Sequence, residues 1–109
     1  MTVSELSKQG GFKLLALPSP DEEIKGVYAG DLLSWVMGKA MDGDLWATIM
    51  SNLNIIAVAT LSNLSCIVLT EGVVPDEDVI KVAMDKGINL LSTELTTYQL
   101  CAYMHGLLK

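Results

Sequence analysis

The sequence predicts a three-layer α/β/α sandwich, an α/β fold with a mostly parallel central sheet. Its 109 residues lie within the size range of one domain, and half of them are hydrophobic, with a mean hydropathy of +0.41. Such values suit a sheet that helices cover on both faces, whose strands are nearly continuous apolar runs. From residue 45 onward, strand-like and helix-like segments alternate three times with short connections, which predicts parallel strands joined by right-handed crossover helices. We therefore expect residues 1–109 to form a single domain.

The first part of the chain contains a short helix and two extended segments. Thr2 and Glu5 have the spacing of a capping box, which predicts a helix over residues 3–9. The apolar run 12–17 ends at a Pro-Ser-Pro loop, so we expect it to be a strand. Residues 24–28 are expected to form a second extended segment.

A further helix and three strand–helix units are expected to follow. Asp31 is expected to cap the helix. Pro75, followed by three acidic residues, is a strong signal for a helix start, and Gly87 is expected to end that helix. Ser92 or Thr93 is expected to cap the last helix. The expected strands cover residues 45–50, 65–70 and 88–91, and the expected helices cover residues 31–41, 53–61, 75–86 and 95 onward.

Charge and sequence motifs argue against several functional classes. The net charge is −6, and the seven Lys and Arg positions are scattered, whereas binding to nucleic acid needs a clustered basic surface. The Gly-Lys pair at residues 38–39 is followed by Ala40, so it is not a P-loop, and the chain has no Gly-x-Gly-x-x-Gly motif. No segment approaches the roughly 18 apolar residues of a membrane span, and residues 1–5 do not resemble a signal peptide. We therefore expect a cytoplasmic protein that binds neither nucleic acid nor a membrane.

The reactive side chains do not form a catalytic or metal-binding pattern. His105 is the single histidine and stands near the end of the last expected helix, where a surface role is commoner than a catalytic one. Cys66 and Cys101 lie in apolar segments, which favours buried free thiols over nucleophiles or zinc ligands. We expect no metal, no cofactor and no catalytic residue, and hence no enzymatic activity.

Small polar residues follow three of the expected strands. In parallel α/β sheets, ligands bind beyond the carboxyl ends of the strands, and the amides of the next helix can hold an anion. The alternative is that these residues are ordinary caps and turns, and the carboxylate of Glu71 would repel an anion. The candidate ligand-binding residues are Ser51, Asn52, Thr70, Glu71, Gly72, Ser92 and Thr93.

Three segments of the chain together carry a family resemblance. They read Gly-Val-Tyr-Ala-Gly-Asp-Leu-Leu-Ser at residues 26–34, Ile-Val-Leu-Thr-Glu-Gly-Val-Val-Pro at 67–75, and Gly-Ile-Asn-Leu-Leu-Ser-Thr at 87–93. In their order and spacing they resemble the DRTGG domain, which is similar to the N-terminal domain of bacterial HPr kinase/phosphorylase. The resemblance covers almost the whole chain. The two elements that give the family its name both differ here: Ser-Asn-Leu stands at residues 51–53, in place of the Asp-Arg element, and Thr-Glu-Gly stands at 70–72.

The resemblance implies a three-layer fold and a dimer-forming accessory domain that regulates rather than catalyses. Larger relatives join this domain to CBS pairs in pyrophosphatases or to acyl-transferase modules. The P-loop kinase domain of HPr kinase is absent here, so kinase activity does not transfer.

Two hypotheses for the function follow. The first is a homodimeric, non-catalytic interaction module with a protein partner, which modulates or scaffolds a metabolic or redox enzyme. Trp35 favours this hypothesis, because it is expected on the helix face away from Leu32, Val36 and Met37 and tryptophan is common in interfaces; packing of Trp35 on a neighbouring loop is the alternative. The second is a sensor domain for a small molecule, either a nucleotide or a phosphorylated metabolite, at the candidate residues.

Overall fold

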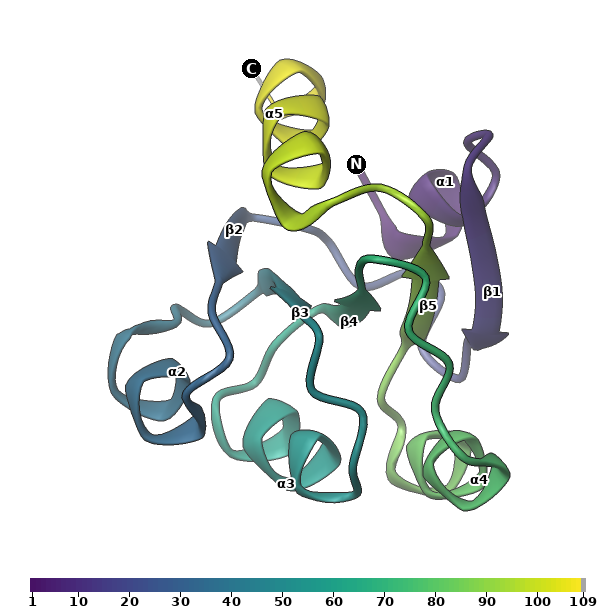
Figure 1. Ribbon diagram of the computed structural model, residues 1–109, viewed down its shortest axis with the longest axis vertical. Coiled ribbons are helices and arrows are strands. Elements are labelled where there is room, and N and C mark those ends of the chain that lie inside the picture. The colour runs from purple at the N-terminus through teal and green to yellow at the C-terminus, as the bar shows by residue number, and fades with distance from the viewer. Residues whose placement is uncertain (109) are drawn as a thin grey trace.

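The computed structural model describes residues 1–108 and contains one five-stranded sheet with helices on both faces (Figure 1). The strand order is β1-β5-β4-β3-β2. The elements are α1 (Val3–Ser7), β1 (Phe12–Ala16), β2 (Gly26–Ala29), α2 (Leu33–Lys39), β3 (Asp44–Thr48), α3 (Asn54–Leu61), β4 (Cys66–Leu69), α4 (Glu77–Lys86), β5 (Leu90–Thr93) and α5 (Thr97–Leu107).

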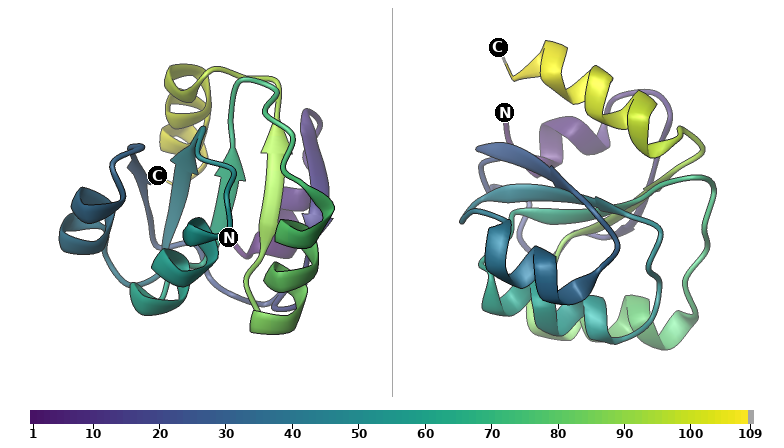
Figure 2. Two further views of the ribbon diagram at one scale, coloured as in Figure 1. Left: turned by 60° about the horizontal axis from the view of Figure 1, so that its bottom comes forward. Right: turned by 60° about the vertical axis from the view of Figure 1, so that its left-hand side comes forward.

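The three-layer prediction is confirmed. Strands β2 to β5 are parallel, and each one pairs with the next along the chain. Because every crossover advances one strand in the same direction, right-handed connections place α2, α3 and α4 on one face of the sheet. The opposite face is covered by α1 and α5 (Figure 2). Strand β1 pairs antiparallel with β5 and forms one edge of the sheet, whereas β2 forms the other.

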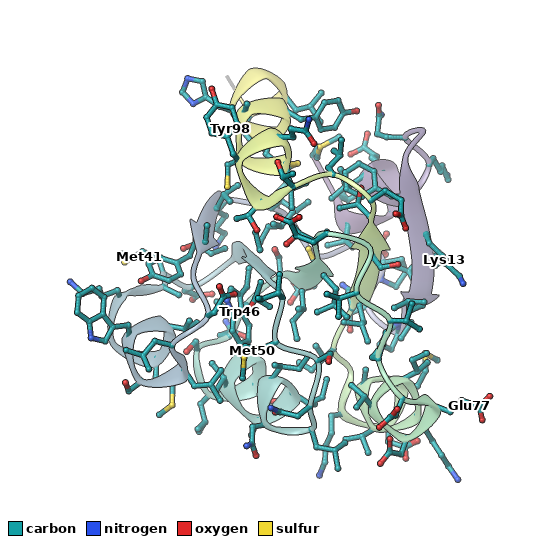
Figure 3. The ribbon with its side chains drawn as sticks, viewed as in Figure 1. Lys13, Met41, Trp46, Met50, Glu77 and Tyr98 are labelled. Carbon is teal, nitrogen blue, oxygen red and sulfur yellow. The ribbon has the colours of Figure 1, made fainter. Side chains whose placement is uncertain are left out.

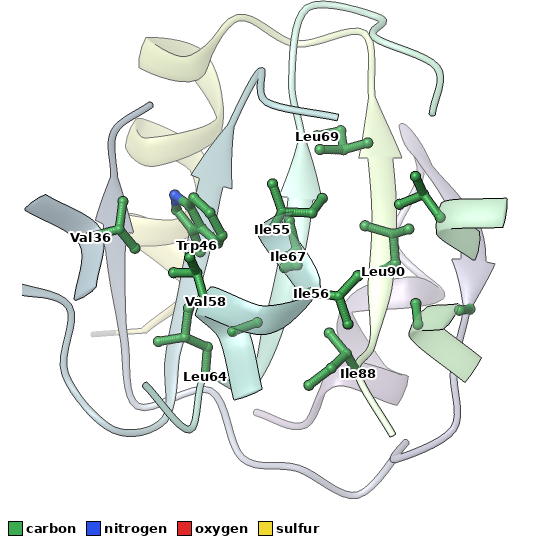
Figure 4. Packing of buried hydrophobic residues seen from close by; sticks show 14 residues of the cluster. Val36, Trp46, Ile55, Ile56, Val58, Leu64, Ile67, Leu69, Ile88 and Leu90 are labelled. Atoms are coloured by element: carbon green, nitrogen blue, oxygen red, sulfur yellow. The ribbon is translucent and has the colours of Figure 1, made fainter. Parts of the chain in front are cut away.

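Each face of the sheet has its own hydrophobic core. The core under α2, α3 and α4 is built around Trp46, whose side chain is completely buried and whose indole N–H donates a hydrogen bond to the carbonyl of Gly30 at 2.8 Å (Figure 4). The core under α1 and α5 contains Leu6, Leu100 and Met104. Every residue of β3 and β4 is buried, as expected of strands that helices cover on both sides.

The predicted caps were right for the first helix and wrong for α2 and α5, and α4 starts later than predicted. Thr2 and Glu5 form the capping box of α1. Asp31 does not cap α2, because the helix begins after Leu32 and the carboxylate binds another loop. Helix α4 begins at Glu77, two residues after the proline that was expected to start it, and ends at Gly87 as predicted.

Ser92 and Thr93 are also not caps. Ser92 and Thr93 stand opposite residues of β1, and this pairing extends β5 two residues beyond its predicted end. The last helix is capped instead by Thr96, which forms a capping box with Gln99.

Candidate functional site

The loops that follow the parallel strands meet at one edge of the sheet, which we call the rim. The rim consists of the loops after β2, β3, β4 and β5, because the carboxyl ends of these four strands point the same way (Figure 2). Ligand sites of parallel α/β sheets lie in this position. All seven candidate residues belong to these loops or to the strand ends beside them.

Asp31 joins the first two loops of the rim. Its Oδ1 accepts hydrogen bonds from the Thr48 hydroxyl at 2.7 Å and from the backbone N–H of Ile49 at 3.0 Å. The Thr48 hydroxyl in turn accepts a bond from the N–H of Met50 at 3.1 Å. These polar groups hydrogen-bond to one another, so they form a structural clamp that holds the loops after β2 and β3 together.

Ser51 and Asn52 lie beyond this clamp, at the start of α3. The Asn52 side chain accepts a bond from the N–H of Asn54 at 2.9 Å, which is the local turn role that the alternative interpretation gave it. Ser51 is half-buried in the same loop. Neither residue lines the cavity described below, so the structure separates this pair from the other candidates.

The loop after β4 is bound tightly to the end of β5. Glu71 and Gly72 both have positive φ angles, 63° and 71°. Their N–H groups donate to the carbonyls of Leu95 and Thr93, at 2.8 and 3.0 Å. The loop therefore cannot move without breaking backbone hydrogen bonds to β5.

The threonine hydroxyls of the rim form hydrogen bonds to other parts of the protein. Thr70 is buried, and its hydroxyl lies 2.7 Å from that of Thr97 at the start of α5. The Thr93 hydroxyl donates to the carbonyl of Gly11 at 2.8 Å and accepts from the N–H of Leu95 at 3.2 Å. Within residues 1–108, every buried side-chain nitrogen and oxygen atom has a partner.

One cavity opens at the rim, with a volume of about 360 Å³. It lies between the start of β1, the loop after β4 and the end of β5. Its lining includes three of the candidate residues, Gly72, Ser92 and Thr93, together with Lys13 and Glu94.

The charged groups of this cavity are one ammonium and one carboxylate. Lys13 projects from β1 (Figure 3). Glu94 lies against Gly72: a Cβ atom there would stand 2.8 Å from a carboxylate oxygen of Glu94. Toward the phosphate groups of a ligand these two residues act in opposite directions, because Lys13 attracts an anion and Glu94 repels it.

Lys13 and Glu94 were not among the residues predicted from the sequence. Glu94 directly follows the candidate pair in the sequence and could have been included. Lys13 reaches the rim only because β1 pairs with β5, and the sequence contains no local signal for that pairing.

The reactive groups outside the rim are few in the described part of the chain. Burial raises the pKa of the Cys66 thiol to about 12, so this thiol stays protonated at neutral pH, in agreement with its predicted inertness. Burial also raises the pKa of Cys101, which is only partly covered. Residues 1–108 contain no group of three or more His, Cys, Asp or Glu side chains that could hold a metal ion. None of the helices that the structure describes has the length and apolar character that a bilayer-spanning helix needs.

The chain is similar to one protein family and to solved structures. The family model described as DRTGG domain matches residues 37–107. No curated protein matches the chain.

One similar solved structure comprises the CBS and DRTGG domains of the regulatory region of Clostridium perfringens pyrophosphatase, complexed with the activator diadenosine tetraphosphate. It has a TM-score of 0.63 and 15% sequence identity, over 81% of this chain and 39% of that chain. The chain thus spans well under half the length of this relative, and at this level of identity the similarity shows a shared fold.

Proposed function

This chain belongs to the DRTGG domain family, and on that premise we propose that it is a non-catalytic regulatory module that acts through protein–protein contact as a homodimer. The observation that carries the proposal is the apolar surface of α2 and its flanks. Four large side chains there are mostly exposed: Leu32 at 61%, Trp35 at 57%, Met37 at 51% and Met41 at 69%. Aromatic residues and methionine are enriched in interfaces relative to the rest of a protein surface.

The partner that we propose is a metabolic or redox enzyme, whose activity the module modulates or scaffolds. The pyrophosphatase named above supports this proposal, since its DRTGG domain belongs to the regulatory region of a metabolic enzyme. Two observations support a non-catalytic role: the Cys66 thiol is protonated, and the buried hydroxyls of the rim already have hydrogen-bond partners within the protein. A cytoplasmic location fits such a partner.

Tryptophan fluorescence tests the homodimer directly. Trp46 is fully buried and Trp35 is exposed, so we expect a concentration-dependent change in emission to come from Trp35. On dilution of a dimer, we expect the Trp35 emission to shift to longer wavelength as the side chain enters water. Trp35→Phe should abolish the shift, and Trp46→Phe should leave it in place. A wild-type emission spectrum that is constant from nanomolar to high micromolar concentration, with a mass near 11.7 kDa by sedimentation, would contradict the proposal.

The second candidate function is a small-molecule sensor, favoured by the cavity that unites Gly72, Ser92 and Thr93. A ligand that binds the folded state raises the melting temperature in proportion to the logarithm of its concentration over Kd. The panel is diadenosine tetraphosphate, ATP, AMP and glucose 6-phosphate. Stabilisation that Lys13→Ala or Ser92→Ala removes, and that Lys81→Ala on α4 retains, would support the sensor. A flat response over the panel leaves the interaction module as the function.

A further inference from the structure

Strand β2 leaves one edge of the sheet open. The N–H of Gly30 donates to the carbonyl of Ala47 in β3 at 3.1 Å. In a parallel ladder, the peptide groups of alternate residues point to the same neighbour. The peptide N–H and C=O groups of Tyr28 therefore point toward β3, as the N–H of Gly30 does. The N–H and C=O groups of Val27 and Ala29 point away from the sheet.

The two edges of the sheet differ in how they resist pairing with another strand. Natural edges are protected by lysines, prolines or β-bulges. At the β1 edge, Lys13 and a register irregularity between Leu14 and Ala16 provide such protection. Strand β2 reads Gly-Val-Tyr-Ala, with no charge, no proline and an unbroken register against β3.

Strand β2 and the two helices beside it, α2 and α5, carry no carboxylate, although the chain has thirteen; the Asp44 carboxylate of β3 lies against Gly26 but is buried. Neither β2, α2 nor α5 contains Asp or Glu, and their charged or titratable groups other than tyrosine and cysteine are Lys39 and His105. In contrast, α4 carries three carboxylates. Two copies of a chain with a net charge of −6 repel each other least when they approach through this surface.

The same surface offers apolar area for a contact with a second copy. Helix α2 is the last helix on its face, beside the β2 edge, and Met41 lies at this outer side (Figure 3). Trp35, Leu32 and Met41, at roughly 100 Å² of exposed area each, supply about 300 Å². The open strand and the adjoining side of α5 bring the area toward the roughly 800 Å² per partner that specific interfaces bury.

We propose that a second copy of this chain binds at β2, so that two five-stranded sheets join into one of ten strands. The two β2 strands run antiparallel about a two-fold axis perpendicular to the sheet at Tyr28. Val27 of each copy then exchanges both backbone hydrogen bonds with Ala29 of the other. This inference rests on the proposed homodimer and assigns its interface.

The two-fold axis fixes the rest of the contact. It keeps equivalent faces together, so α2 lies beside α2 of the second copy and α5 beside α5. Tyr28 faces its own equivalent in a non-hydrogen-bonded pair, where aromatic side chains stabilise antiparallel strands. The Tyr28 ring is partly buried against the core under α2, which orients it for this pairing.

The test is Ala29→Pro, examined by sedimentation equilibrium and amide hydrogen exchange. Proline removes the outward N–H of Ala29 but no bond between β2 and β3, so the fold is retained and circular dichroism should be unchanged. We expect the wild type at about twice the chain mass of 11.7 kDa, and the variant near 11.7 kDa. The amide of Val27 should exchange at least 100-fold faster in the variant. Trp35→Glu should also give a monomer, whereas Met84→Glu, on α4 at the other end of the sheet, should remain a dimer.

The outcomes separate this inference from the proposed function. A wild-type dimer that persists in both Ala29→Pro and Trp35→Glu, with Val27 equally unprotected in all forms, overturns the β2 interface and leaves the homodimer intact. A monomeric wild type at high micromolar concentration overturns both.

Discussion

The missing side chain of Gly26 lets the Asp44 carboxylate lie against β2. A Cβ atom at this position would stand 2.7 Å from Oδ1 of Asp44. The carboxylate cannot move away freely, because Asp44 is buried and its Oδ2 accepts a bond from the N–H of Met41 at 2.9 Å. The glycine is thus needed for space.

We predict that Gly26→Ala lowers the free energy of unfolding by about 1–3 kcal/mol, through overpacking and loss of the bond to Met41. Urea unfolding measures it. Gly38→Ala is the matched control, since a Cβ there meets nothing within 4 Å and α2 should gain about 1 kcal/mol of helix propensity. Equal effects of the two variants would refute the close contact.

Cys66 makes stability depend on pH at the alkaline end. Its folded-state pKa is about 12, against an ordinary value of 9.0. Above pH 9 the unfolded chain loses this proton while the folded chain keeps it, so stability falls as the pH rises toward 12, by up to about 1.4 kcal/mol per pH unit. Cys66→Ala should remove this slope, as measured by urea unfolding between pH 8.5 and 11. A slope that is the same in the variant would show that other groups cause it.

At the level of elements, buried strands were easier to predict from the sequence than caps. The runs that became β3 and β4 are apolar at nearly every position, and such runs have few alternatives in a protein of this size. Ser92 and Thr93 have good capping side chains, but whether they cap a helix or extend a strand is decided by β1, about 80 residues away.

The contrast between local patterns and distant strand pairing also explains which residues of the candidate site were predicted. Gly72, Ser92 and Thr93 were expected together, because parallel strands bring their carboxyl ends to one edge. The tight α3 turn keeps Ser51 and Asn52 apart from them. Lys13 was missed because its strand enters the sheet antiparallel.

The capping box of α5 allows a prediction at this scale. Thr96 accepts a bond from the N–H of Gln99 at 3.1 Å, and the Gln99 side chain accepts one from the N–H of Thr96 at 2.9 Å. Thr96→Ala should lower the free energy of unfolding by about 1 kcal/mol. Thermal melts measure this change. In such melts Ser34→Ala, at an exposed position inside α2, should leave the free energy of unfolding unchanged. A neutral Thr96→Ala would mean that α5 is held by packing alone.

In the whole molecule, the two cores share one sheet and should unfold together. Ile55 belongs to the core under α3 and Leu100 to the core under α5, and both side chains are completely buried. We predict that Ile55→Ala and Leu100→Ala each cost about 2–5 kcal/mol and shift one common transition. Trp46 fluorescence and far-ultraviolet circular dichroism should give the same midpoint in each variant. Separate midpoints for the two probes would show that one core melts alone.

The antiparallel pairing of β1 with β5 also governs the order in which the chain can fold during its synthesis. Phe12 and its partner Thr93 stand 81 residues apart. At about 5–20 residues per second, a ribosome needs roughly 4–16 s to make the intervening chain. The parallel strands can assemble in order as they emerge, each beside the one before, while the first strand waits for the last. A nascent chain halted before residue 90 should therefore keep β1 accessible to chaperones or proteases, and its release from them should coincide with the emergence of β5.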